Sequence, residues 1–141
     1  MKPWRAALVL AMVVSGHGAG AQSSMTFHAR LSPVPIDVSM LSKVAGSGSA
    51  KAVLDGRKLA ISGKFEGLRS RATFARLHRA QKGVRGPAVF DLSISKETSG
   101  NISGTVELTP TQVEDLKNSR FYIQVYSEGA PDGNLWGWLL P

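Results

Sequence analysis

Hydrophobic and polar residues alternate with a period of two over most of the chain beyond residue 25, which is the pattern of β-strands that bury one face. Residues 57–65 show it clearly, because Leu59, Ile61 and Phe65 fall on one face of an extended segment. The other face carries Lys58, Lys64 and small residues. The alternation therefore predicts a sheet with one face in a core and the other in water.

The same pattern predicts further strands at residues 25–31, 37–41, 50–54, 72–78, 88–94, 102–108, 120–127 and 134–140. Asp55-Gly56 lies between two of them and is typical of a tight hairpin, because a type I′ turn needs positive φ at both central positions. Pro33 and Pro35 are expected to end the first strand, since proline cannot donate to a ladder. Turns or loops are expected at residues 45–49, 81–87, 99–101 and 130–133.

Residues 109–118 are the segment that favours an α-helix. Thr109 is a natural N-cap, Pro110 suits the first helical position, and Gln112 completes a capping box. Asn118 is expected to end the helix after about two turns. A helix this short is expected to close a barrel end or a sandwich corner.

About eight short strands, regular turns and one short helix predict an all-β fold, either an antiparallel β-sandwich or a Greek-key-like barrel. The chain has 141 residues, of which 43% are hydrophobic, and this is enough for one domain with a packed core. It has no cysteine, which excludes disulfides, thiolate metal sites and a cysteine nucleophile.

The first residues read as a cleaved secretory signal rather than as part of the fold. Lys2 and Arg5 precede an apolar run at residues 6–14, and Ala19-Gly20-Ala21 offers a small-x-small cleavage pattern. The run is shorter than the ~20 residues that a membrane span needs. We therefore expect a signal peptide at residues 1–21, a mature domain at residues 22–141, a periplasmic or secreted location, and no transmembrane segment after cleavage.

Positive charge is concentrated in the middle of the chain. The formal net charge is +7 and the sequence pI is about 10.2. Residues 57–85 contain a single acid, Glu66, beside these nine basic residues: Arg57, Lys58, Lys64, Arg69, Arg71, Arg76, Arg79, Lys82 and Arg85. This predicts a positive field on the middle of the domain.

Several segments, in their order and spacing, resemble the CHRD (chordin) domain family. The resemblance begins with an alternating strand followed by prolines, and continues with a strand that runs into a Gly-rich loop ending in Gly86-Pro87. It continues with Leu108-Thr109-Pro110-Thr111-Gln112, the segment from Tyr122 to Tyr126, Pro131-Asp132-Gly133 and Leu135-Trp136-Gly137-Trp138. It covers roughly residues 25–141 and implies the same all-β architecture.

The family pattern has His-x-His on the central strand and a third histidine on a later strand, which the resemblance would present as metal ligands. In this chain Arg76 stands at the first position, His78 keeps the second, and Tyr126 replaces the third. A guanidinium cannot ligate a cation, so we expect a polar cluster of these three residues and no metal or other cofactor. A copper–zinc superoxide dismutase is excluded by ligand count, because residues 22–141 contain two histidines, His28 and His78.

The motifs of hydrolytic enzymes are missing from the sequence. It has no Gly-x-Ser-x-Gly elbow, and Asp91 and Glu107 have no evident partner of opposed role. The segment 82–87 is rich in glycine and basic residues but leads into a strand, whereas a phosphate-binding loop opens a helix. We therefore expect no catalytic residues.

Two groups of residues remain as candidates for binding. Arg71, Arg79, Lys82 and Arg85 lie in or beside the central loop, where a cationic surface can meet acidic polymers or lipid head groups. Trp136 and Trp138 share one face of the last strand and are expected to be buried, with exposure for a sugar or partner as the alternative if Leu135 and Leu139 form the core.

The sequence thus predicts an exported, non-catalytic CHRD-like binding or interaction domain. Its partner would be an unknown protein or an anionic polymer, and specific nucleic-acid recognition is not expected because aromatics are sparse in the basic run. The alternatives are a metal-binding or other envelope enzyme, and association with anionic envelope polymers or lipids through the basic surface.

Overall fold

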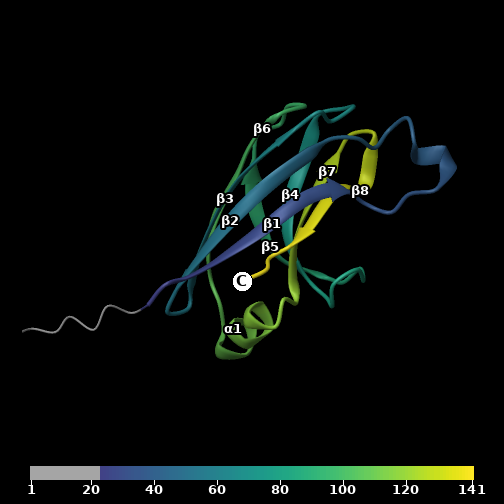
Figure 1. The fold of residues 1–141 in the computed structure, drawn as a ribbon. Coiled ribbons are helices and arrows are strands. Elements are labelled where there is room, and N and C mark those ends of the chain that lie inside the picture. Colours follow the sequence, from purple (N-terminus) through teal and green to yellow (C-terminus); the bar gives the residue numbers. More distant parts are fainter. Residues whose placement is uncertain (1–22) are drawn as a thin grey trace, which may run out of the picture.

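Eight antiparallel strands close into one barrel in the computed structural model, which describes residues 23–141 (Figure 1). The predicted signal peptide lies outside the described residues. The strands are β1 (Met25–Pro33), β2 (Ser47–Asp55), β3 (Lys58–Glu66), β4 (Ala72–Arg79), β5 (Ala88–Ile94), β6 (Gly100–Glu107), β7 (Phe121–Ser127) and β8 (Ala130–Trp138). Around the barrel they follow the order β1-β2-β3-β6-β5-β4-β7-β8. The predicted all-β class is confirmed, and of the two architectures the barrel is the one observed.

The barrel core is built from the alternating apolar positions. Leu59, Ile61 and Phe65 of β3 are buried, as their spacing predicted, and Phe27 of β1 and Leu77 of β4 are completely enclosed. The hairpin between β2 and β3 is also confirmed, since Asp55 pairs with Lys58. Its two turn residues are Gly56 and Arg57, and of these only Gly56 has a positive φ, at 61°, so the turn is not of the predicted type I′. Period-two patterning therefore decides which faces of these strands point inward.

The helix α1 (Pro110–Lys117) lies at one end of the barrel (Figure 1). Thr109 accepts a hydrogen bond from the Gln112 backbone N–H, and the Gln112 side chain accepts one from the Thr109 backbone N–H, so the predicted capping box is confirmed. Leu116 is fully buried beneath the barrel end.

Four local predictions are wrong, and one of them is the turn at residues 99–101, because β6 already begins at Gly100. Residues 37–41 form no strand, because Val38–Met40 make a short 3₁₀ helix (η1) with Val38 84% exposed. Residues 45–49 are only partly a turn, because β2 already begins at Ser47. The hairpin turn before the last strand is at residues 128–129, whereas Pro131-Asp132-Gly133 lies inside β8.

The segment Pro131-Asp132-Gly133 forms a bulge in β8. Ser127 pairs with Ala130 and Val125 pairs with Leu135, so β8 advances five residues while β7 advances two. Gly133 takes a φ of 130°, which non-glycine residues rarely adopt. The bulge bends β8 and lifts Asp132 above the outer surface of the barrel, beside the site described below.

The barrel closes between β1 and β8. Ser32 pairs with Trp136, Pro33 pairs with Leu135, and a separate bridge joins His28 to Leu140. β1 therefore continues through Pro33, beyond the end predicted at residue 31. Closure gives each of the eight strands a neighbour on both sides, although only two residue pairs join β5 to β6.

Candidate functional site

The register of β4, β7 and β8 collects the candidate residues on the outer face of the barrel. His78, Tyr122 and Trp138 form one row across these strands, because Tyr122 pairs with both neighbours. Arg76, Gln124 and Trp136 form the next row, and Phe74 lies opposite Tyr126. We call this group the aromatic–arginine face, defined by Arg76, His78, Arg85, Tyr122, Gln124, Tyr126, Trp136 and Trp138.

His78 is buried at 6% exposure and both of its ring nitrogens are occupied. The Gly86 carbonyl oxygen lies 2.8 Å from Nδ1 and can only accept, so Nδ1 carries the proton. The Tyr126 hydroxyl lies 2.6 Å from Nε2 and donates to it. Burial lowers the pKa of His78, with smaller contributions of the same sign from Arg76 and Arg85, so the neutral imidazole is the form that this site holds at pH 7.

Tyr126 lies between His78 and Arg76. The Arg76 guanidinium lies 5.5 Å from the Tyr126 ring centroid and 5.0 Å from that of Phe74, as in cation–π contacts. Burial raises the pKa of Tyr126, which keeps the phenol protonated and able to donate to His78. The structure thus brings together the three residues of the predicted polar cluster.

Aromatic rings are stacked along the row of His78. The ring of Tyr122 lies parallel to His78 at a centroid distance of 4.8 Å, and Trp138 lies 4.4 Å from Tyr122 on the far side. Trp136 meets Trp138 edge-on at 4.7 Å. These contacts make a second apolar layer outside the barrel wall.

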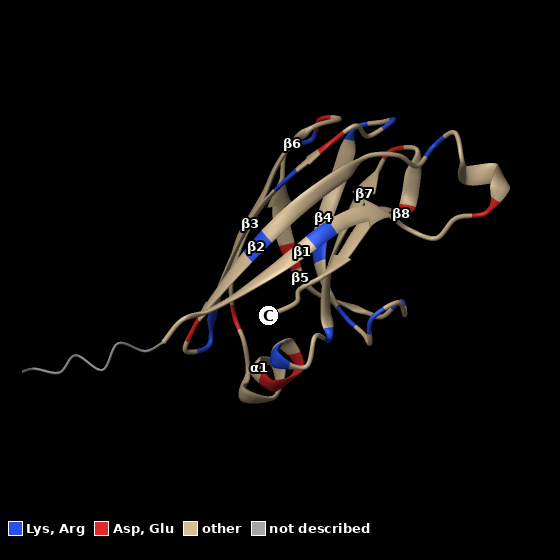
Figure 2. Ribbon diagram, in the orientation of Figure 1, with Lys and Arg blue, Asp and Glu red and all other residues tan. Residues whose placement is uncertain are grey.

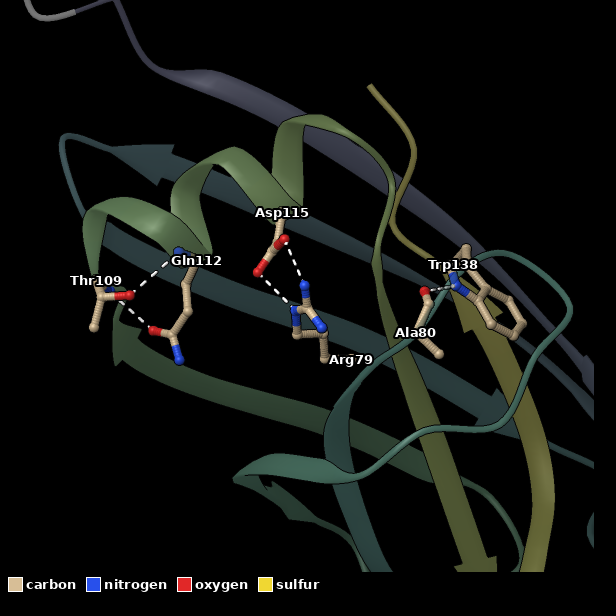
Figure 3. Close-up of polar contacts among 6 residues, drawn as sticks. All are labelled: Arg79, Ala80, Thr109, Gln112, Asp115 and Trp138. Atoms are coloured by element: carbon tan, nitrogen blue, oxygen red, sulfur yellow. Dashed lines mark hydrogen bonds and ion pairs between the residues drawn. The ribbon is translucent and has the colours of Figure 1, made fainter.

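The loop 80–87 covers this layer and is tied to it by hydrogen bonds. The Gly86 N–H donates to the Tyr122 hydroxyl at 3.0 Å, and that hydroxyl donates to the Gly86 carbonyl at 3.2 Å. Trp138 Nε1 donates to the Ala80 carbonyl at 3.0 Å (Figure 3). The loop is therefore held in one place by bonds from β7 and β8.

A pocket of about 520 Å³ opens between this loop and the bulge of β8. Arg85 lies at its rim, where its guanidinium donates to the Asp132 carbonyl at 3.0 Å and lies 5.9 Å from the Trp136 ring centroid. Gln124 lines the pocket at 3% exposure, and its Nε2 donates to the same Asp132 carbonyl. Its Oε1 is buried without a hydrogen-bond partner within residues 23–141, which leaves an acceptor beside the pocket.

Arg79 is exposed, as expected, but it lies apart from this face and is paired with a carboxylate. Its guanidinium makes two hydrogen bonds to the Asp115 carboxylate of α1, at 2.7 and 3.0 Å (Figure 3). The Arg79 side chain also lowers the pKa of Asp115, chiefly through the hydrogen bond. Arg79 thus joins β4 to the helix, while Arg71 and Lys82 are exposed in loops, as expected.

Two further carboxylates have partners that the sequence did not show. Asp91 pairs with Arg76 at 3.1 Å, and Glu107 pairs with Arg57 at 3.0 Å. Of the nine basic residues at 57–85, three are therefore in ion pairs, so the predicted positive field is weaker than the sequence count suggests.

The sequence left two alternatives for Trp136 and Trp138, burial or an outward position, and the structure shows part of each. Leu135 and Leu139 are fully buried in the barrel core, so the tryptophans point outward. Trp138 is nevertheless only 7% exposed, because the loop covers it, and Trp136 is half-buried. Burial is confirmed for Trp138, although it lies in the outer layer.

Sequence reasoning missed Tyr122 and Gln124 as parts of the site. Both share a strand face with Tyr126, which the alternation in β7 already indicated. The alternation could not show that other residues cover this outward face, but in the structure both faces of β7 are buried.

Within residues 23–141 no group of three or more metal-ligating side chains comes together. In the same part of the chain, no helix is both long and apolar enough to cross a membrane.

A closed eight-stranded antiparallel barrel with one capped helix and a loop-covered aromatic face defines an all-β domain. The chain belongs to the CHRD domain family, whose model matches residues 27–139. That family membership indicates a binding or interaction domain. No curated protein and no solved structure matches the chain.

Proposed function

We propose that this chain is an exported, non-catalytic binding module, located in the periplasm or secreted, whose aromatic–arginine face holds an acidic group of a protein or polymer partner. The observation that carries the proposal is the pocket rimmed by Arg85 and floored by buried tyrosine and glutamine side chains. The surrounding hydrogen bonds hold its walls in one arrangement, which lowers the entropy cost of binding.

Arg85 supplies the charge of this pocket. Its hydrogen bond goes to a backbone carbonyl, and among residues 23–141 it forms no ion pair. Asp132 also lines the pocket, but its carboxylate makes no ion pair with Arg85. A guanidinium stacked on Trp136 keeps donors free for a carboxylate or sulfate, and bidentate geometry favours such groups.

The non-catalytic part of the proposal follows from the hydrogen bonds of His78. A general base needs a free ring nitrogen near its substrate, and both nitrogens of His78 are engaged. Tyr126 keeps its proton, since burial raises its pKa. Neither group is placed to exchange a proton with a ligand.

The test uses the two tryptophans of the predicted mature chain, which both lie in this face. Poly-glutamate is titrated into the protein at low and high salt while tryptophan fluorescence is followed. We expect saturable quenching that weakens with salt, and we expect Arg85→Ala to weaken it about tenfold or more, as the loss of a charge-assisted contact implies.

Arg57→Ala is the matched control, because it removes the same charge on another side of the barrel. Equal loss in the two variants, or quenching that salt does not change, would contradict the assignment of this face.

Association with anionic envelope polymers through the basic segment 57–85 is the second candidate function. Six of its nine basic residues have no ion pair in the described part of the chain. The protein should then be retained on anionic vesicles or polyanions in a salt-sensitive way, and retention unaffected by salt would count against it.

A further inference from the structure

A second surface lies on the opposite side of the barrel, on the outer face of β1, β2, β3 and β6. Strand pairing aligns two rows of residues across these four strands. We call this surface the lysine–serine face, defined by His28, Lys51, Ser62 and Ser103 in one row and Arg30, Ser49, Lys64 and Asn101 in the other. All eight residues are exposed.

Three cations form a triangle on this face. Arg30 and Lys64 are two strands apart in one row, about 10 Å at the usual strand spacing. Lys51 lies diagonally between them, about 7–8 Å from each. None of the three is in an ion pair within residues 23–141.

The acidic residues of these strands lie at the strand ends. Asp55, Glu66 and Glu107 are the terminal residues of β2, β3 and β6, and Figure 2 shows basic positions in the middle of β2 and towards the end of β1. The centre of the face is thus positive, with Glu66 at one border. Like charges this close repel each other, so their grouping opposes folding unless an anion lies over them.

The face is hollowed along the two rows. One hollow of about 410 Å³ and another of about 630 Å³ share Ser49, Lys64 and Asn101. They lie one after the other along the same four strands and therefore form one shallow groove, with Glu66 in the lining of the second hollow.

The side chains between the cations are short and polar. Hydroxyl and amide groups of Ser49, Ser62 and Asn101 can donate and accept hydrogen bonds, which suits a chain that carries both anionic groups and hydroxyls. Apart from the imidazole of His28, the eight residues include no aromatic side chain for base stacking, and they include no large apolar side chain for a lipid bilayer.

We propose that the lysine–serine face binds an acidic polysaccharide. In the barrel order, β2 and β3 are separated from β4 and β7 by two strands on either side, so Lys51 and Lys64 lie away from the aromatic–arginine face, whereas Arg30 lines one pocket together with Trp136 and Trp138. A domain with both sites can link a partner on one side to a glycan on the other.

The experiment measures binding of polygalacturonate at several salt concentrations, with neutral dextran as the uncharged control. The variant replaces Arg30, Lys51 and Lys64 by Ser, and a charge-matched variant replaces Lys43, Arg69 and Arg120 by Ser. We expect the Arg30, Lys51 and Lys64 variant to lower the slope of log Kd against log salt by about 2, because the polymer releases fewer counterions when it meets fewer cations. We expect the second to change it little.

Equal losses in the two variants would show that net charge alone drives binding and would overturn the proposal. The proposal would also be overturned if the protein bound anionic phospholipid vesicles more tightly than polygalacturonate and the first variant weakened both equally. That result would identify a membrane surface as the ligand. The first variant should lower the slope by the same amount in an Arg85→Ala background, which separates this test from that of the aromatic–arginine face.

Discussion

The hydrogen bond between Tyr126 and His78 permits a quantitative prediction about stability. Tyr126→Phe removes the hydroxyl but keeps the ring beneath Arg76, so it leaves His78 Nε2 buried without a partner. An unsatisfied buried acceptor costs about 1–3 kcal/mol. We therefore expect this variant to lose about 2 kcal/mol of unfolding free energy.

His78→Phe has the complementary effect. A phenyl ring can keep the stack on Tyr122, and the Gly86 carbonyl keeps its bond from the Tyr122 hydroxyl. The Tyr126 hydroxyl loses its acceptor, so we expect a similar loss of about 2 kcal/mol. With both partners absent, no polar group of the pair is stranded, so the double variant should lose no more than either single variant, about 2 kcal/mol, which is a coupling of about 2 kcal/mol.

Urea denaturation followed by tryptophan fluorescence measures all three variants, with an unchanged m-value as the condition for comparing midpoints. Thr109→Ala, which removes the helix cap at the barrel end, serves as the additivity control when combined with Tyr126→Phe. The control pair should add within about 0.5 kcal/mol. A strictly additive Tyr126–His78 pair, or a Tyr126→Phe variant as stable as the parent, would refute the reasoning.

Three further predictions concern pH and packing. Because burial lowers the pKa of His78, its neutral form stabilises the fold fully above the ordinary pKa of 6.5, and this stabilisation is lost as pH falls through the lowered value. His78→Phe should therefore flatten the dependence of the melting temperature on pH below 6.5. The hydrogen bond from Arg79 lowers the pKa of Asp115, so this pair stabilises the fold above pH 3.8 and the stabilisation is lost below it. Asp115→Asn or Arg79→Gln should remove this loss of stability in acid. An unchanged profile of stability against pH would show that the pair contributes nothing. Gly137→Ala should prevent closure between β1 and β8, because the new methyl group would overlap the Arg30 carbonyl oxygen, and a soluble variant with wild-type melting would contradict that packing.

The strands and the helix were largely predictable because their signals are local. Alternation identified the buried face of β3, and the capping box identified the start of α1 within the residues Thr109 to Gln112. The strand predicted at residues 37–41 is wrong because the apolar residues there alternate but have no neighbouring strand to pair with. Glycine misled the prediction for residues 45–49, where Gly48 lies within β2 so that the Lys64 carbonyl can approach closely.

The site was less predictable because its contacts join distant residues. Arg79 and Asp115 are 36 residues apart, and no spacing rule relates them. The assignment of Trp138 assumed that a strand has one buried face, whereas the loop 80–87 buries the outward face as well. The triangle of Arg30, Lys51 and Lys64 depends on strand register, which the sequence does not specify.

The barrel wall is two side chains thick on one side and one side chain thick on the other. Around β7, a change in the outer layer disturbs rings and bonds that also support the fold, so substitutions there should be few. On the outer face of β1, β2 and β3, side chains end in solvent, and most replacements leave the core untouched. Under selection, the thin side of the wall can change its ligand preference quickly, while the thick side keeps its shape.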